Sequence, residues 1–324
     1  MAGTGNRDSK VRRFKKVGVL AGGPSSERDI SLASGEAVNN ALLKGGVNSV
    51  FIDVRERVRD AVRKSGADAV FIALHGGFGE DGTVQSILEK LKIPYTGSGP
   101  DASRLALDKL ASREIFRGIG IDVPKYKVLK KNRDSRMDSL NMPVVVKPQK
   151  EGSSVGLSVV FDLKRLKKAI DKAFDYGDKI LIEEFIRGRE LTVGILADKP
   201  LPVIEIVPEG DLYDYYAKYE SPKTKYLVPA PITDKDFDKA KEIGLKAHKT
   251  LGCRYFSRVD MVLGDDGRIY VLEVNTIPGL TSRSLLPKAA LVTGVDFCGL
   301  CIKILEASTL NGRRRSNEAR TYGA

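Results

Sequence analysis

Short apolar runs alternate with amphipathic stretches through about the first hundred residues. Apolar runs at 17–21, 50–53 and 69–74 predict buried strands. A helix is expected from about Ser31 to Gly45, and a second one where apolar residues recur at the spacing of one helix face, at Val84, Ile87, Leu88 and Leu91. Strands that alternate with helices form parallel sheets with covered faces, so this pattern predicts an α/β domain at 17–97.

The remainder of the chain predicts two further units, at 98–184 and 185–309. The first contains strands at 144–147 and 179–183, with a glycine-rich loop and a helix from Asp162 to about Tyr176 between them. The second opens with strands at 191–196 and 203–207 and continues through a loop rich in Tyr and Pro at about 209–231. A helix, a hairpin and a C-terminal helix follow. A loop of that length is usually functional or disordered.

Composition places the chain among ordinary globular proteins. Of its 324 residues, 42% are hydrophobic and 30% charged, which excludes a disordered chain or a fibre. No run approaches the roughly 20 apolar residues of a membrane helix, so no membrane insertion is expected. The first segment lacks the apolar region of a secretory signal. The expected location is the cytoplasm, with a transit peptide left open.

The net charge of +12 is concentrated at the two ends. The basic tail at 1–16 has six Lys or Arg against one Asp, and the tail at 310–324 has four Arg against one Glu. Basic tails bind nucleic acid or anionic membranes weakly. Solvated termini are the favoured interpretation, so no specific nucleic-acid partner is expected.

The sequence also predicts where the cysteines and one histidine lie. Three cysteines, Cys253, Cys298 and Cys301, form an odd and sparse set that favours a reducing compartment. Cys298 and Cys301 have metal-ligand spacing, but they lie in an apolar helical stretch without further ligands, which favours buried thiols over zinc. His248 is expected at a surface or boundary position of its helix.

The strongest chemical signal is a predicted hairpin at 258–275. Residues two apart on a strand share a face, so Arg258 and Asp260 pair with Glu273 and Asn275 on one face of the hairpin. A turn centred on Asp265 and Asp266 would place Arg258 opposite Glu273, with Asp260 diagonal to it. Two carboxylates and an amide oxygen suit Mg²⁺. An exposed face with ordinary ion pairs is the alternative, which the run that follows at 276–282 disfavours.

Three loops add weaker signals. The loop after Lys147 contains Gly152, Ser153, Ser154 and Gly156, and small residues let backbone N–H groups approach phosphate oxygens. It lacks the spacing of a P-loop. The loops at 22–31 and 75–82 follow predicted parallel strands, where open α/β sheets bind ligands. Each loop alone is equally consistent with a plain turn.

Taken together and in order, these stretches resemble the D-alanine–D-alanine ligases of the ATP-grasp superfamily. The resemblance covers about 17–307 and rests on the following segments: 22–32, 74–82, 94–99, 107–109, 147–158, 213–219, 258–260 and 272–281. Departures are few: Leu107 and Leu280 stand where Met is usual, and Gly77-Phe78 replaces a common Arg-Gly. The resemblance implies a three-domain ATP-grasp architecture whose N-terminal domain is α/β with a parallel sheet.

The resemblance also implies a nucleotide site. ATP would lie between the second and third units, with Lys109, Lys147 and Ser154 at its phosphates. The backbone of Glu183, Glu184, Phe185 and Ile186 would meet adenine, and Glu190 would bind the ribose. Asp260, Glu273 and Asn275 would hold two Mg²⁺ ions, for which Mn²⁺ is a substitute.

The implied reaction joins two D-alanine molecules through a D-alanyl phosphate, for peptidoglycan precursor synthesis. Glu27 would bind the ammonium of the first D-alanine, with His75 nearby. Arg258 and the N–H of Gly279 would hold the oxyanion, and Ser284 the second carboxylate. Ser153 and Tyr219, beside Lys218, would link to Glu27 and close the long loop over the site. A homodimer is also implied.

Two alternatives stay open at this point. A depsipeptide ligase would join D-alanine to D-lactate, and family members that do so can have Phe at the position of Tyr219. A basic module that binds ATP or nucleic acid without catalysis is disfavoured, because all four hairpin residues are retained and most of the charge lies in the tails.

Overall fold

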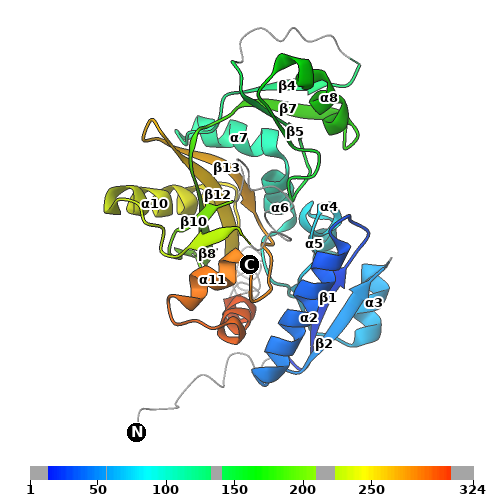
Figure 1. Ribbon diagram of the computed structural model, residues 1–324. Helices are drawn as coiled ribbons and strands as arrows, with labels where there is room; N and C mark the ends of the chain where they lie inside the picture. Colours follow the sequence, from blue (N-terminus) through cyan, green and yellow to red (C-terminus); the bar gives the residue numbers. More distant parts are fainter. Residues whose placement is uncertain (1–13, 56, 133–140, 209–222, 308–324) are drawn as a thin grey trace, which may run out of the picture.

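Three sheets organise the chain, one for each of three successive stretches of sequence (Figure 1). The structure is a computed structural model that describes residues 14–55, 57–132, 141–208 and 223–307. Its α/β architecture agrees with the predicted fold class. The boundaries predicted for the units and tails stay a prediction.

The N-terminal sheet is parallel, as predicted, with strand order β2-β1-β3. Its elements are β1 Val17–Gly22, α2 Arg28–Lys44, β2 Ser49–Val54, α3 Val58–Ser65, β3 Ala69–Ile72, α4 Gly77–Glu80 and α5 Thr83–Lys90. All six residues of β1 are buried because the strand is central and covered. The pattern missed α3, since this short and highly charged helix buries only Val58 and Val62.

The central sheet is antiparallel, with order β4-β7-β5-β6. Its elements are β4 Tyr126–Lys130, β5 Val144–Pro148, β6 Ser158–Val160, α8 Leu163–Phe174 and β7 Lys179–Glu184. Asp162 caps α8 by accepting from the N–H of Lys164. The apolar stripe Leu166, Ala169 and Ala173 packs α8 on the sheet.

The C-terminal sheet has the order β11-β10-β8-β12-β13, with β9 beside β8. Its elements are β8 Gly188–Leu196, β9 Lys199–Pro200, β10 Ile204–Val207, β11 Lys225–Leu227, α10 Asp234–Thr250, β12 Phe256–Gly264, β13 Ile269–Asn275 and α11 Leu285–Leu291. Two earlier helices, α6 Pro100–Leu107 and α7 Lys109–Gly118, bury Ala106 and Phe116 in the core of this sheet. Along the chain, these helices lead from the N-terminal part into β4 of the central sheet (Figure 1).

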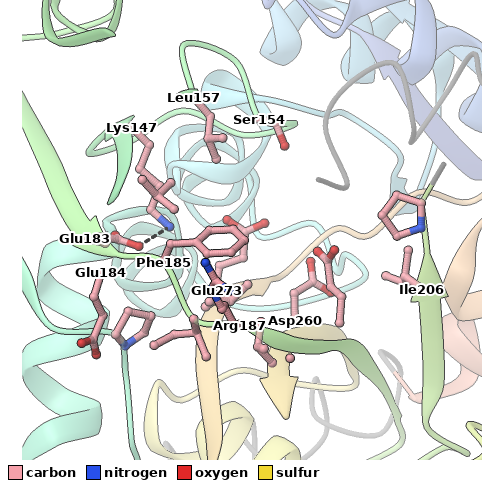
Figure 2. Close-up of a pocket in the computed structure, with 18 of the residues that line it drawn as sticks. Lys147, Ser154, Leu157, Glu183, Glu184, Phe185, Arg187, Ile206, Asp260 and Glu273 are labelled. Carbon is pink, nitrogen blue, oxygen red and sulfur yellow. Dashed lines mark ion pairs between the residues drawn. The ribbon is translucent and has the colours of Figure 1, made fainter. Parts of the chain in front are cut away.

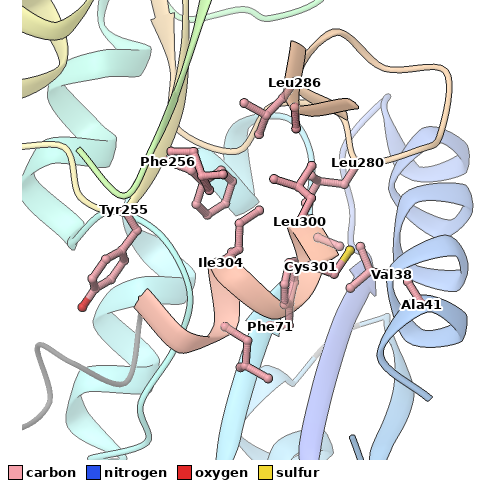
Figure 3. Packing of buried hydrophobic residues seen from close by; sticks show 14 of the residues in the cluster. Val38, Ala41, Phe71, Tyr255, Phe256, Leu280, Leu286, Leu300, Cys301 and Ile304 are labelled. Atoms are coloured by element: carbon pink, nitrogen blue, oxygen red, sulfur yellow. The ribbon is translucent and has the colours of Figure 1, made fainter. Parts of the chain in front are cut away.

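A helix at 297–307 packs between the N-terminal and C-terminal parts (Figure 3). Leu300, Cys301 and Ile304 are fully buried in the cluster that also contains Val38 and Phe71 of the N-terminal part. The predicted burial of Cys301 is confirmed, whereas Cys298 is half-buried and its Sγ lies 3.2 Å from the Ala41 carbonyl oxygen. Among the described residues, no helix is both long and apolar enough to cross a membrane.

The surface or boundary position expected for His248 is wrong. The side chain is fully buried, with Nδ1 2.7 Å from Ser257 Oγ and Nε2 3.2 Å from Asp198 Oδ1. The physical reason is the face of α10 that meets the sheet. It includes Ala240, Gly244, Ala247 and His248, which recur at helical spacing. Burial lowers the pKa of His248, and the hydrogen bond to Asp198 acts in the opposite direction.

Candidate active site

The hairpin of β12 and β13 brings its four polar residues to one face, but in a different register from the one predicted. Asp260 lies opposite Glu273, and Arg258 lies opposite Asn275. Gly267 adopts a positive φ of 74°, which lengthens the turn to three residues, and a bulge leaves Leu272 without a partner on β12. Each irregularity shifts the pairing by one residue. Because a shift of two residues returns a side chain to the same face of the strand, the four polar residues still lie on one face, as predicted.

Asp260 is held firmly by its neighbours. Arg258 donates from Nε to Oδ1 at 2.8 Å and from Nη2 to Oδ2 at 2.7 Å. The hydroxyl of Thr192 on β8 donates to Oδ1 at 2.6 Å. Both charged side chains are nearly buried, which strengthens a two-pronged ion pair of this kind.

The same face offers oxygen donors for a hard cation. The carboxylate of Glu273 lies opposite that of Asp260, and its Oε2 is 3.6 Å from the ammonium of Lys109. Asn275 Oδ1 accepts from the N–H of Ile277 at 3.0 Å, which fixes the amide orientation. Two carboxylates and an amide oxygen, partly neutralised by one Arg and one Lys, fit Mg²⁺ or Mn²⁺.

A first cavity, of about 650 Å³, lies between the central and C-terminal sheets (Figure 2). It contains every described residue that was predicted to hold the nucleotide, together with two of the predicted metal ligands: Lys109, Lys147, Ser154, Glu183, Glu184, Phe185, Ile186, Glu190, Asp260 and Glu273. The central sheet contributes Lys147 at the end of β5 and Glu183 at the end of β7. The cavity therefore has cationic, anionic and apolar walls.

A buried ion network lies at one wall of this cavity. Lys147 Nζ is 3.0 Å from Glu183 Oε2, and Arg113 of α7 donates to Glu183 Oε1 (Figure 2 shows the first pair). Burial lowers the pKa of Lys147 to about 8, with Glu183 opposing and Arg113 adding to the effect. Burial opposes the charge of Glu183 as well, but Arg113 and Lys147 hold its pKa below the usual value.

Sequence reasoning missed Arg113. The available signal was its spacing of four residues from Lys109, which puts two side chains on one face of a helix, but no helix was predicted there; the structure has α7 at this place. Sequence reasoning also assigned Glu183 through its backbone, whereas the carboxylate of Glu183 joins the ion network. At the expected adenine end, the amides of Glu184 and Phe185 donate to Lys125 and Pro143 carbonyls. The rings of Phe185 and Phe161 are 6.1 Å apart and form an apolar corner.

A second cavity, of about 440 Å³, lies beside the first and contains the residues predicted for the amino-acid substrates. These are Glu27, His75, Ser153, Arg258, Gly279 and Ser284, and the predicted metal ligand Asn275 also lines this cavity. Ser153 donates its hydroxyl hydrogen to Glu27 Oε1, which links the glycine-rich loop to the N-terminal part. Lys218 and Tyr219 lie outside the described residues.

His75, which is buried, and Glu80, which is nearly so, line this second cavity from the N-terminal part. His75 Nε2 is 2.9 Å from Ser34 Oγ, and its Nδ1 is 3.8 Å from Glu80 Oε1. Burial raises the pKa of Glu80, and His75 acts in the opposite direction. Glu80 was predicted to lie in a loop that could bind a ligand or form a plain turn, and it was given no role of its own.

The loop between β13 and α11 supplies the far wall of the second cavity. Ser284 Oγ accepts from the N–H of Thr281 at 3.1 Å and lies 3.0 Å from its hydroxyl. A Cβ on Gly279 would come within 2.9 Å of Ser284 Oγ. Gly279 and Ser284 are therefore in close contact, and this contact requires glycine.

The two cavities meet at three residues. Lys109, Glu151 and Glu273 line both of them. The ammonium of Lys109 donates to the carbonyl of Glu151, so the start of α7 is fixed to the glycine-rich loop at this junction. A group that passes from a ligand in the first cavity to a ligand in the second would pass between one cation and two carboxylates.

The chain is similar to known ligases over most of its length. Residues 115–306 match the family model described as the D-ala D-ala ligase C-terminus, and residues 54–98 match the D-ala D-ala ligase N-terminus. A D-alanine–D-alanine ligase of Citrifermentans bemidjiense is 47% identical over 296 residues, which are 91% of this chain and 97% of that protein. One of Geobacter sulfurreducens is 44% identical over 298 residues, covering 91% and 94%.

Solved structures give the same result. The D-alanine–D-alanine ligase of Bacillus anthracis complexed with ATP superposes with a TM-score of 0.81 at 33% identity, over 93% of this chain and 99% of that one. The VanG D-Ala:D-Ser ligase of Enterococcus faecalis has a TM-score of 0.79 at 28% identity, over 91% of this chain and all of that one.

Proposed function

The chain belongs to the D-alanine–D-alanine ligase family, and we propose that it joins two D-alanine molecules at the junction of its two cavities. In this reaction the carboxylate of the first D-alanine takes the γ-phosphoryl group of ATP, which gives an acyl phosphate and ADP. The amine of the second D-alanine then attacks the activated carbonyl and releases phosphate. The product is D-alanyl-D-alanine, a precursor of peptidoglycan. The observation that supports this most is that Lys109, Glu151 and Glu273 line both cavities.

The first cavity suits ATP. Lys109 and Lys147 supply positive charge at its buried end, and Ser154 lies in the loop above them. At the opposite end the Phe161–Phe185 corner and the chain at Glu183–Ile186 suit an adenine ring, with Glu190 in reach of the ribose. Cationic groups that are already in place stabilise the charge of the transferring phosphoryl group without reorganisation.

Asp260, Glu273 and Asn275 would hold two Mg²⁺ ions, or Mn²⁺ in their place. The metal would neutralise phosphate charge and orient the phosphates. Arg258, which is bound to Asp260, lies at the boundary of this cluster and the second cavity, where it can contact the transferring group.

The second cavity suits two small amino acids. Glu27 would bind the ammonium of the first D-alanine, with His75 beside it. Arg258 and the N–H of Gly279 would stabilise the oxyanion formed when the second amine attacks. Ser284 would bind the carboxylate of the second D-alanine. Ser153, Lys218 and Tyr219 would close the site and exclude the water that hydrolyses acyl phosphates.

Release of ADP across a set of amino acids tests this function. We expect ADP release to require D-alanine and Mg²⁺ and to be absent with L-alanine. ADP release that ignores D-alanine would contradict the proposal. A homodimer and a cytoplasmic location are further proposals from the family, and light scattering of the purified protein tests the first of them.

D-Lactate offered beside D-alanine tests the ester alternative. In the family resemblance, Tyr219 would link to Ser153 and Glu27 and favour an amine acceptor. We therefore expect mostly dipeptide near neutral pH and more ester in Tyr219→Phe. Product analysis that finds mostly ester with the unmodified protein would favour the depsipeptide ligase.

A further inference from the structure

Arg113 is a fully buried cation that contacts neither cavity. It projects from α7 one turn after Lys109, and its guanidinium donates to Glu183 Oε1 on β7. The same group lies 5.7 Å from the ring centre of Tyr126 on β4. A buried guanidinium is costly unless its charge is paired, and here Glu183 pairs it.

The second terminal nitrogen of the Arg113 guanidinium reaches the hairpin of β12 and β13. Its Nη2 donates to the carbonyl of Leu272 at 3.2 Å. Leu272 is the bulge residue, which has no partner on β12, and it directly precedes Glu273. The bulge is also what places Asp260 opposite Glu273. Arg113 therefore binds the irregularity that defines the register of the polar face.

We propose that Arg113 is a positioning residue for nucleotide binding: it orients Glu183, and through it Lys147, while holding the Leu272 bulge in place beside Glu273. One side chain thus fixes the phosphate-binding wall of the central sheet relative to the carboxylates of the C-terminal sheet. This inference rests on the proposed use of the first cavity for ATP.

The charge of Arg113 has a separate effect on Lys147. The charged groups that face Lys147 are Glu183 on β7, Arg113 and Lys109 on α7, and Glu273 on β13. The pKa of Lys147 is lowered to about 8, mainly by burial; Arg113 and Lys109 act in the same direction, and Glu183 and Glu273 act against it. Removing the positive charge of Arg113 therefore raises the pKa of Lys147, so the lysine stays charged to higher pH.

Titration of the full-length protein with ATP and Mg²⁺, in the absence of D-alanine, tests the proposal over pH 7.5 to 10. We expect Arg113→Gln to weaken ATP binding by about 10- to 100-fold at pH 7.5, by analogy with the loss found when the partner that orients a metal ligand is removed. We also expect the pH at which affinity declines to move upward. Arg113→Lys keeps the charge but not the two-pronged geometry, so it should weaken binding without moving that pH.

Arg117→Gln is the matched control, because Arg117 is an exposed arginine one turn further along α7. Arg117→Gln should change neither the affinity for ATP nor the pH at which that affinity declines. Wild-type affinity and pH dependence in Arg113→Gln would overturn the proposal, even if the variant melts at a lower temperature. If Arg113→Gln does not fold, wild-type affinity in Arg113→Lys overturns it. A wild-type protein that binds ATP but forms no dipeptide would refute the proposed function and leave this comparison intact.

Discussion

Charged side chains in the two cavities are held by neighbouring side chains. Asp260 accepts from Arg258 and Thr192, and Lys147 is paired with Glu183. Such contacts fix the direction of each charge before a substrate arrives. Catalysis benefits because groups that are already oriented need no reorganisation when charge develops.

Replacing either hairpin carboxylate should remove activity without unfolding the protein. Asp260→Asn and Glu273→Gln each delete one negative charge from the proposed metal site, and we expect dipeptide formation to fall about 100-fold or more. Asp265→Asn, an exposed acid at the tip of the same hairpin, is the control and should keep full activity. Near-normal turnover of either variant at ordinary Mg²⁺ would refute the metal assignment.

His248 should make the protein less stable in acid. Because burial lowers the pKa of His248 below its ordinary value of 6.5, the unfolded chain binds a proton at higher pH than the folded protein does. Its contribution is therefore complete above about pH 6.5 and is lost as the pH falls through the folded-state value. We expect the free energy of unfolding, measured with urea, to fall less between pH 7 and pH 5 in His248→Gln than in the wild type. An equal difference would contradict this assignment.

At the scale of elements, the hairpin shows what the sequence could and could not predict. Alternation along 258–260 and 273–275 was sufficient to place the four polar residues on one face, because strand periodicity is local. The predicted pairing of these residues across the hairpin was wrong. The alternation in the sequence gives no sign of the left-handed Gly267 or of the bulge at Leu272, and these two features set the register. The ion pair of Arg113 with Glu183 and its hydrogen bond to the Leu272 carbonyl could not be predicted either, because they join α7 to strands 70 and 159 residues away in the chain.

The motifs selected residues that the structure brings together in two cavities. The pattern gave a less complete prediction of the helices and of which residues are buried. All of the proposed site residues within the described ranges line one cavity or the other, whereas the helix α3 and the burial of His248 were not anticipated. Site residues are recognisable because their chemistry restricts residue type and spacing. Helix existence and burial depend on contacts with distant elements.

The loop between β13 and α11 gives a test at this scale. Alanine at Gly279 would place a Cβ 2.9 Å from Ser284 Oγ and displace that hydroxyl. We expect Gly279→Ala to lower kcat/KM for D-alanine about 10-fold or more, since a displaced binding group loses its alignment. ATP binding should be unchanged because neither residue lines the first cavity. If Gly279→Ala weakened ATP binding as much as it lowered kcat/KM for D-alanine, the assignment of ATP and D-alanine to separate cavities would be contradicted.

At the scale of the molecule, the two cavities depend on three separate parts of the chain. The N-terminal part supplies Glu27 and His75, the central sheet supplies Lys147, and the C-terminal sheet supplies Asp260 and Glu273. The buried helix at 297–307 holds the first and third parts together. Most of the two basic ends, 1–13 and 308–324, lies outside the residues that the structure describes.

Truncation of the ends should leave ligation intact. Phe14 packs against the core, and the N–H groups of Lys15 and Lys16 donate to Asp68, so the N-terminal truncation should stop at residue 13. A protein without 1–13 and 312–324 should retain activity within about twofold and bind DNA with a smaller salt dependence. A large loss of activity would show that one of these ends contributes to the site.

In the proposed reaction, a phosphoryl group passes between the two cavities to a D-alanine carboxylate. D-Alanine labelled with ¹⁸O in its carboxylate tests this directly, because the oxygen that attacks the γ-phosphorus leaves with the phosphate when the peptide bond forms. Mass spectrometry of the released phosphate should therefore find one ¹⁸O for each dipeptide made. Dipeptide that accumulates while the phosphate remains unlabelled would contradict the account.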